Sequence, residues 1–309
     1  MDDLRLRGWR LSVQLFSFAV LTYGGRLGLR LGHCLPCFSC PYVGGCAGHC
    51  YLMAGQGPHW GAQMPFAGML SSWGLRALEM LGGFVLLAVL FSKLWCGWIC
   101  PFGSLQDGIS WARKKLGIRG TRFSWSLRDK LKPVKYVLLI LLIIIPLGIA
   151  NAGLHPDLQF PFCQICPAKP LMPVFAGDVQ YFAVDTTNLV TVIMTGLSVI
   201  LAAGFIIGMI FKERFFCMFC PLLALLSLFG KAGFVRFRKR VDACAGCRNC
   251  QRVCPMDIRE VHLDKEDALT GDCILCLRCI GSCPQDKALS LNFFKKTIFS
   301  SSRKYVANG

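Results

Sequence analysis

The sequence predicts an α-helical membrane domain followed by a smaller, cysteine-rich α+β domain. Of the 309 residues, 54% are hydrophobic, and the mean hydropathy is +0.50. A soluble domain of this length does not need so many apolar residues to fill its core. The chain also has 19 cysteines, which lie in tight clusters, many of them followed by proline. This pattern differs from the dispersed cysteines of a secreted disulfide protein and favours metal ligation.

The basic residues that give the chain its net charge of +17 are unevenly distributed along the sequence. Such an excess could indicate nucleic-acid binding, but the basic residues alternate with segments that have almost none. No Lys or Arg lies between Cys34 and Leu75, whereas eight lie between Pro101 and Pro133 and seventeen lie from Lys212 onward. Lys and Arg are enriched in the cytoplasmic loops of membrane proteins. We therefore expect this chain to interact with a membrane and not with nucleic acid.

Four apolar stretches are long enough to cross a hydrocarbon core of about 30 Å, which takes about 20 helical residues. The first begins with arginines and could be read as a signal peptide. Four spans, however, put every basic segment on one side. We therefore expect a multi-pass protein of the bacterial inner (cytoplasmic) membrane with both termini in the cytoplasm. The predicted transmembrane helices are Trp9–Leu31, Trp73–Trp95, Pro133–Gly153 and Asn188–Phe211.

A cysteine–proline motif follows each predicted span and reveals an internal repeat. The motifs after the first and third spans are 126 residues apart, and those after the second and fourth are 120 or 121 residues apart. Two spans per repeat give both halves the same orientation, related by a pseudo-twofold axis along the membrane normal. The motif pairs are Cys37-x2-Cys40-Pro with Cys163-x2-Cys166-Pro, and Cys96-x3-Cys100-Pro with Cys217-x2-Cys220-Pro.

This repeat predicts that four thiols come together on each side of the membrane. Four cysteines are the ligand set of a [4Fe–4S] or [2Fe–2S] cluster. Proline favours the first helical position, so Cys100 and Cys220 should precede helices, whose N-termini stabilise thiolates and anionic clusters. Structural zinc is an alternative for either site, and a disulfide is an alternative on the outer side. The predicted inner set is Cys96, Cys100, Cys217 and Cys220, and the predicted outer set is Cys37, Cys40, Cys163 and Cys166.

The C-terminal cysteines form the most specific motif in the chain. Two runs with the spacing Cys-x2-Cys-x2-Cys-x3-Cys-Pro begin at Cys244 and Cys273. This doubled run is typical of bacterial ferredoxins with two [4Fe–4S] clusters, in which the fourth cysteine of each run binds the other cluster. We expect a cytoplasmic ferredoxin-like domain at 236–292, between a membrane domain at 1–235 and a basic tail at 293–309. The predicted ligand sets are Cys244, Cys247, Cys250 and Cys283 for one cluster, and Cys273, Cys276, Cys279 and Cys254 for the other.

Several residues on the outer side have more than one interpretation. Cys34, Cys46 and Cys50 could belong to an extra outer metal site, with His33 or His49 as a further ligand, or they could form a disulfide or remain free thiols. Arg26 and Arg30 could hold a quinone head group or stabilise an outer cluster, or they could extend to the interface. Glu79 could accept a proton from a quinol or could simply be solvated. No residue is predicted to be catalytic.

The combination of these motifs from Trp73 to Leu291 resembles the membrane polyferredoxins of the NapH/NosR/CcoG type. The resemblance rests on four spans, the inner motifs Cys96–Pro101 and Cys217–Pro221, and the doubled ferredoxin run. It implies a quinol-dehydrogenase-like subunit of an oxidoreductase complex, which passes electrons between the quinone pool, cytoplasmic clusters and an extracytoplasmic redox partner. The chain departs from the NapH pattern in its second inner motif, which has two residues between the cysteines, and in its seven outer cysteines.

The sequence therefore predicts an electron conduit that links cytoplasmic ferredoxin clusters, membrane clusters and an outer or quinone partner. Two alternatives are a quinol dehydrogenase subunit without an outer cluster, and an assembly or metal-reducing factor for another metalloenzyme. Sites on opposite faces of about 30 Å of hydrocarbon would leave a very long electron transfer step. Either the cysteine–proline segments enter the bilayer, or a partner subunit contributes a cofactor between them.

Overall fold

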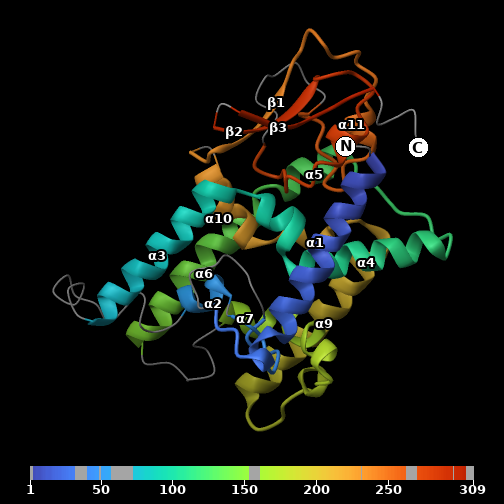
Figure 1. The fold of residues 1–309 in the computed structure, drawn as a ribbon. Helices are drawn as coiled ribbons and strands as arrows, with labels where there is room; N and C mark the ends of the chain where they lie inside the picture. The colour runs from blue at the N-terminus through green and yellow to red at the C-terminus, as the bar shows by residue number, and fades with distance from the viewer. Residues whose placement is uncertain are drawn as a thin grey trace.

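The computed structural model consists of a bundle of helices with a small β-sheet at one end (Figure 1). The start of the first helix lies near this sheet (Figure 1). The structure describes residues 3–31, 40–48, 50–56, 72–152, 161–230, 232–261, 270–294 and 296–303. Among the residues considered above, His33, Cys34, Cys37 and His49 lie outside these ranges.

A long helix occupies each of the four predicted spans: α1 (Asp3–Tyr23), α3 (Ser72–Phe91), α6 (Val134–Ala152) and α9 (Leu189–Phe211). Helix α9 begins with a capping box, in which the Asn188 side chain accepts a hydrogen bond from the Thr191 amide and the Thr191 hydroxyl accepts one from the Asn188 amide. In the part of the chain that the structure describes, α9 alone has both the length and the hydropathy of a membrane-crossing helix. Its most apolar 18-residue window is only 11% buried, so its apolar side chains face outward.

The first helix begins and ends earlier in the chain than predicted. The sequence predicts a span that ends at Leu31, but α1 ends at Tyr23 and continues as a 3-10 turn, η1 (Gly24–Leu27). Apolar composition continues past Tyr23, whereas the backbone turns at the glycine pair. A Cβ atom at Gly25 would lie 2.2 Å from the Cys46 carbonyl oxygen, so only glycine permits this close approach. Arg26 and Arg30 consequently lie beyond the helix rather than in its second half.

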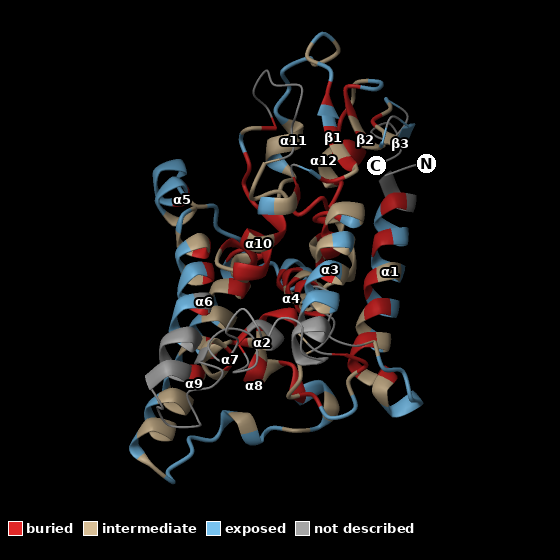
Figure 2. Ribbon diagram, turned by 90° about the vertical axis from the view of Figure 1, so that its left-hand side faces the viewer, coloured by how far each residue is buried: buried red, intermediate tan, exposed pale blue. Residues whose placement is uncertain are grey.

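Short helices begin at the prolines that follow the inner cysteines. Helix α4 (Pro101–Lys115) has Cys100 at its N-cap, and α10 (Pro221–Gly230) begins directly after Cys220. The sequence predicts both starts. Helix α10 is largely buried and packs between α3 and α6 (Figure 2). The remaining short helical segments are α2 (Tyr51–Gln56), η3 (Trp95–Ile99), α5 (Trp125–Leu131), α7 (Pro161–Ile165), α8 (Ala168–Leu171), η5 (Pro173–Ala176), η6 (Gln180–Phe182) and η7 (Phe215–Met218).

The C-terminal part is built on an antiparallel sheet of β1 (Val235–Lys239), β2 (Leu289–Phe293) and β3 (Lys296–Ser300) in the order β1-β2-β3. The two ferredoxin-like motifs lie between β1 and β2 and contain the short helices α11 (Asn249–Arg252) and α12 (Arg278–Gly281). The sequence predicts a separate basic tail from residue 293, but β3 lies within that segment and pairs with β2. Its burial pattern does not alternate along the strand, so it lacks the regular alternation of buried and exposed residues that signals a strand.

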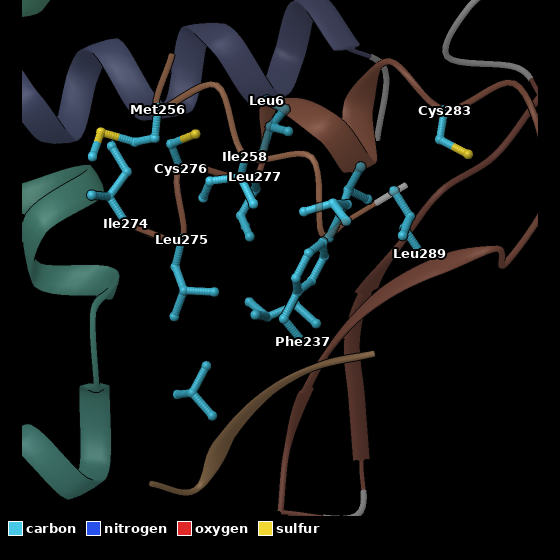
Figure 3. Packing of buried hydrophobic residues seen from close by; sticks show 14 of the residues in the cluster. Leu6, Phe237, Met256, Ile258, Ile274, Leu275, Cys276, Leu277, Cys283 and Leu289 are labelled. Atoms are coloured by element: carbon cyan, nitrogen blue, oxygen red, sulfur yellow. The ribbon is translucent and has the colours of Figure 1, made fainter. Parts of the chain in front are cut away.

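The sheet domain rests directly on the helices. Its core includes Phe237, Ile258 and Leu289, and Leu6 of α1 joins the same cluster (Figure 3). Buried ion pairs reinforce this contact: Asp272 binds the Lys135 ammonium at 2.5 Å and the Arg128 guanidinium at 2.9 Å. Both basic side chains are almost fully buried, at 1% and 2% exposure. Breaking such pairs leaves uncompensated buried charge, so the sheet domain is held in one position against the helices.

Candidate iron–sulfur sites

Eight cysteines of the helical part line a single internal cavity, which we call the cysteine cavity. The inner set contributes all four of its members to the wall. The other four are cysteines that the sequence places on the outer side, three of them from the outer motifs. Because both groups border one cavity, they do not lie on opposite faces about 30 Å apart, and the cysteine–proline segments instead fold inward. The cysteines that line the cavity are Cys96, Cys100, Cys217 and Cys220, together with Cys40, Cys50, Cys163 and Cys166.

Four described outer cysteines lie together, and three of them, Cys40, Cys163 and Cys166, belong to the predicted outer set. Cys50 is the fourth outer cysteine that lines the cavity. The remaining predicted ligand, Cys37, lies outside the described residues. Sequence spacing alone left Cys50 unassigned, because its place depends on how α2 packs against α6 and α7.

The structure also locates the other outer-side residues whose roles the sequence leaves open. The Cys46 thiol donates a hydrogen bond to the Gly48 carbonyl at 3.1 Å and does not line the cysteine cavity. Arg26 lies over the Tyr23 ring and near the Ala176 carbonyl oxygen. Arg30 and Glu79 are exposed. None of these positions contributes to the wall of the cysteine cavity.

Two glutamines repeat the same contacts at the two halves of the cavity. Gln106 donates a hydrogen bond to the Cys217 sulfur at 3.5 Å and accepts one from the Phe216 amide at 3.0 Å. Gln56 likewise donates to the Cys163 sulfur at 3.3 Å and accepts from the Phe162 amide at 2.9 Å. Sequence analysis missed both residues. The signal was present, since each glutamine lies six residues after a cysteine of the cavity, Cys50 or Cys100.

Hydrogen bonds from these glutamines should affect the reduction potential of an iron–sulfur cluster bound beside them. N–H···S hydrogen bonds stabilise the more reduced, more negative state of an iron–sulfur cluster and so raise its reduction potential. We expect Gln106→Leu to lower the midpoint potential of the inner cluster and Gln56→Leu to lower that of the outer cluster. Each change also leaves a buried amide unpaired, at a cost of about 1–3 kcal/mol.

The measurement is an EPR-monitored redox titration of both variants beside the unmodified protein. Each variant serves as the control for the other, because the two sites are chemically matched. A shift of both signals in each variant, or of neither, would contradict the assignment of one glutamine to each site.

The ferredoxin-like motifs form two further cavities whose walls contain the two predicted ligand sets. The structure brings together the members of each set although the fourth cysteine comes from the other motif. One cavity, which also touches Cys250, is lined by Cys254, Cys273, Cys276 and Cys279, and the other by Cys244, Cys247, Cys250 and Cys283. We call the first set the proximal set, because it faces the helices, and the second the distal set.

The backbone around both ferredoxin sets is shaped to wrap a cluster. The residue after the second cysteine of each motif, Arg248 or Leu277, has a positive φ of 58° or 59°. In the proximal set, the Leu275 amide points to the Cys273 sulfur at 3.5 Å and the Ile258 amide to the Cys254 sulfur at 3.4 Å. Amide donors aimed at cysteine sulfurs are typical of iron–sulfur sites.

The donor chemistry of the proximal set also fits iron. Burial raises the pKa of the Cys254 thiol to about 12 and that of the Cys273 thiol to about 11, so the thiolate form there needs the compensating charge of bound metal. No three acidic, histidine or cysteine side chains among the described residues converge closely enough to share one metal ion.

The inner set and the proximal set are in direct contact through the loop after Cys96. The Trp98 indole donates a hydrogen bond to the Leu275 carbonyl oxygen at 3.0 Å. A Cβ atom at Gly97 would lie 2.4 Å from the Ile274 carbonyl oxygen and 3.1 Å from the Cys276 Cα atom. Glycine at position 97 therefore lets the two cysteine loops approach more closely than any other residue would allow.

A buried charge network lies beside this contact. Asp107 of α4 binds Arg214 through two hydrogen bonds of 2.9 and 2.6 Å, binds Arg278 at 3.3 Å, and also pairs with Arg10. Arg214 is fully buried and donates a further bond to the Cys96 carbonyl oxygen at 2.9 Å. Burial acts to raise the pKa of Asp107, but the charges of Arg214 and Arg10 outweigh it and hold that pKa well below its usual range. The network thus carries an excess of positive charge between two cysteine sets.

Comparisons with known proteins also indicate iron–sulfur binding. A family described as a 4Fe-4S binding domain matches twice, at residues 73–119 and 194–241, and a 4Fe-4S dicluster domain matches at residues 243–289. An uncharacterised protein of Methanocaldococcus jannaschii is 30% identical over 69% of this chain and 77% of its own length. No solved structure shows significant similarity to the chain.

Two relatives with descriptive names are also similar. The ferredoxin-type protein NapH of Haemophilus influenzae is 29% identical over 68% of this chain and 67% of its own length. The Escherichia coli protein YccM, which is named for electron transport, is 26% identical over 74% of this chain. This chain spans 59% of the length of YccM.

Proposed function

This chain belongs to the family of NapH/NosR-type polyferredoxins, and we propose that it conducts electrons through four [4Fe–4S] clusters between the cytoplasm and a membrane or outer partner. At a coarser level, it is an electron-transport protein with 4Fe-4S binding domains. The four clusters would be held by the proximal set, the distal set, the inner set, and an outer set of Cys40, Cys50, Cys163 and Cys166.

One observation carries this proposal: the inner and outer cysteines line the same cavity, and the inner loop touches the proximal set through Gly97 and Trp98. The distal and proximal sets adjoin within the ferredoxin-like domain, where Cys250 borders both of their cavities. Each cluster would then have a neighbour, which removes the need for a cofactor from a partner subunit inside the membrane. The order is distal, proximal, inner and outer.

We place the four long helices across the bacterial cytoplasmic membrane, with both termini and the ferredoxin-like domain in the cytoplasm. The outward apolar surface of α9 supports this placement, as do the exposed Leu15 and Phe16 of α1, at 62% and 72% exposure. The two matches of one 4Fe-4S domain family, at corresponding positions in the two halves, support the proposed internal repeat. In this arrangement the distal set meets a cytoplasmic redox partner, while the outer set faces quinone or an extracytoplasmic carrier.

The iron content tests the proposal. Four cubanes require about sixteen iron atoms and about sixteen sulfides per chain, whereas a ferredoxin domain alone requires about eight of each. We expect about sixteen in anaerobically purified protein and about twelve in the Cys163→Ala variant. A value near eight in the unmodified protein would show that neither membrane cluster is present. Stoichiometric zinc would favour structural zinc sites instead.

A further inference from the structure

A second large cavity, which we call the basic cavity, lies where α1, α4 and the ferredoxin-like domain meet. Its volume is about 630 Å³, within the usual range for ligand pockets. It borders Cys254 and Cys276 of the proximal set but none of the inner or outer cysteines. The electron route described above does not use it.

The wall of the basic cavity carries a strong excess of positive charge. Eight basic and three acidic side chains line it. The acidic groups already have basic partners: Asp107 binds three arginines, Glu213 binds Lys114 and Arg278, and Asp257 binds Lys212. The basic side chains are Arg7, Arg10, Arg113, Lys114, Arg122, Lys212, Arg252 and Arg278. An anion in this cavity would therefore meet net attraction without displacing an existing carboxylate.

The rim of the basic cavity is apolar, which distinguishes a lipid from a free anion. Leu11 of α1 and Trp111 of α4 line the cavity and are 56% and 61% exposed. Leu15, one turn further along α1, is 62% exposed. Tryptophan and arginine together at a cytoplasmic membrane boundary are typical of lipid contacts.

We infer that the basic cavity binds the phosphate head group of an anionic phospholipid, whose acyl chains lie against Leu11, Trp111 and Leu15. This inference rests on the membrane placement proposed above. The bound phosphate would lie beside the proximal cysteine set, where its negative charge would lower the reduction potential of the cluster. Lipid composition would thereby tune one step of the electron route.

The test compares the unmodified full-length protein with the double variant Arg122→Gln/Arg252→Gln. Both side chains are exposed and line the cavity. Arg122 makes a 3.9 Å contact with Asp257 and donates a hydrogen bond to the Arg252 carbonyl oxygen, and neither arginine belongs to a hydrophobic core cluster, so the fold should tolerate the change. The matched control is Arg236→Gln/Arg238→Gln on β1, which makes the same change in charge away from the cavity. Native mass spectrometry after purification from membranes measures the anionic lipid retained by each protein.

We expect at least a threefold lower retained fraction in the Arg122/Arg252 variant and unchanged retention in the control. In nanodiscs, phosphatidylglycerol should lower the midpoint potential of one ferredoxin cluster relative to phosphatidylcholine, and the variant should lose this difference. Equal lipid retention by all three proteins would overturn the inference. So would an equal shift produced by inorganic phosphate in phosphatidylcholine discs, because the ligand would then be a free anion.

Carbonate washing of membranes tests the membrane placement separately from the lipid inference. If the chain is released from membranes by carbonate washing, the membrane placement itself fails and the lipid inference fails with it. If the chain stays in the membrane while lipid retention is equal in all variants, only the lipid inference falls.

Discussion

Replacing Cys50 by alanine should remove about four iron atoms per chain, whereas Cys46→Ala should leave the iron content unchanged. Cys50 lines the cysteine cavity together with Cys40, Cys163 and Cys166, and Cys46 does not. The Cys46 thiol is bonded to the Gly48 carbonyl instead. Loss of one of four thiolate ligands should prevent stable assembly of the outer cluster. The measurement is iron and sulfide analysis of protein purified without oxygen, with EPR to identify the missing signal.

The spacing of the motifs and the structure favour different ligands beside Cys50. Cys46-x3-Cys50 has the same spacing as Cys96-x3-Cys100 in the inner set, so sequence symmetry favours Cys46 as a ligand. In the structure, Cys40 and not Cys46 lines the cavity beside Cys50. We therefore expect Cys40→Ala to behave like Cys50→Ala. Loss of iron in Cys46→Ala with retention in Cys40→Ala would show that the symmetric spacing decides the ligand.

Replacing Asp107 by asparagine should produce the largest loss of stability outside the cysteines. Asp107 is the shared partner of Arg10, Arg214 and Arg278, and the Arg214 side chain has no solvent exposure. Removing one partner of a buried ion pair typically costs about 3–5 kcal/mol, because the remaining charge is left buried and uncompensated. Here Arg10 and Arg214 lose their carboxylate partner together, while Arg278 keeps Glu213. Thermal unfolding followed through cluster absorbance should show a clear decrease in the transition temperature.

The same substitution should also change the electrochemistry of the neighbouring clusters. Asparagine removes a negative charge between the inner and proximal sets, so their midpoint potentials should rise. A suitable control is Asp129→Asn, whose carboxylate forms an exposed pair with Lys132 at 2.9 Å; exposed pairs contribute little, and neither stability nor potential should change noticeably. Unchanged potentials in Asp107→Asn would mean that the network is structural only.

Local features of the sequence were sufficient to predict much of this protein. The ferredoxin ligand sets follow from two cysteine runs with short fixed spacing, and the structure brings together the same residues. The four long helices follow from apolar length, and the starts of α4 and α10 follow from Pro101 and Pro221. In each case the determining interactions act within a few residues of chain, so sequence distance is a good guide to spatial distance.

Only the tertiary structure decided the arrangement of the cysteines in the helical part. Spacing predicts which helix each motif follows, but not how far its segment folds back between the helices. The single cysteine cavity, the place of Cys50 and the matched bonds of Gln56 and Gln106 depend on packing between segments about 110 residues apart. The end of α1 at Tyr23 likewise depends on contact between Gly25 and the Cys46 carbonyl. Such long-range contacts leave no periodic trace in a single sequence, because they are selected by shape and burial rather than by local backbone preference.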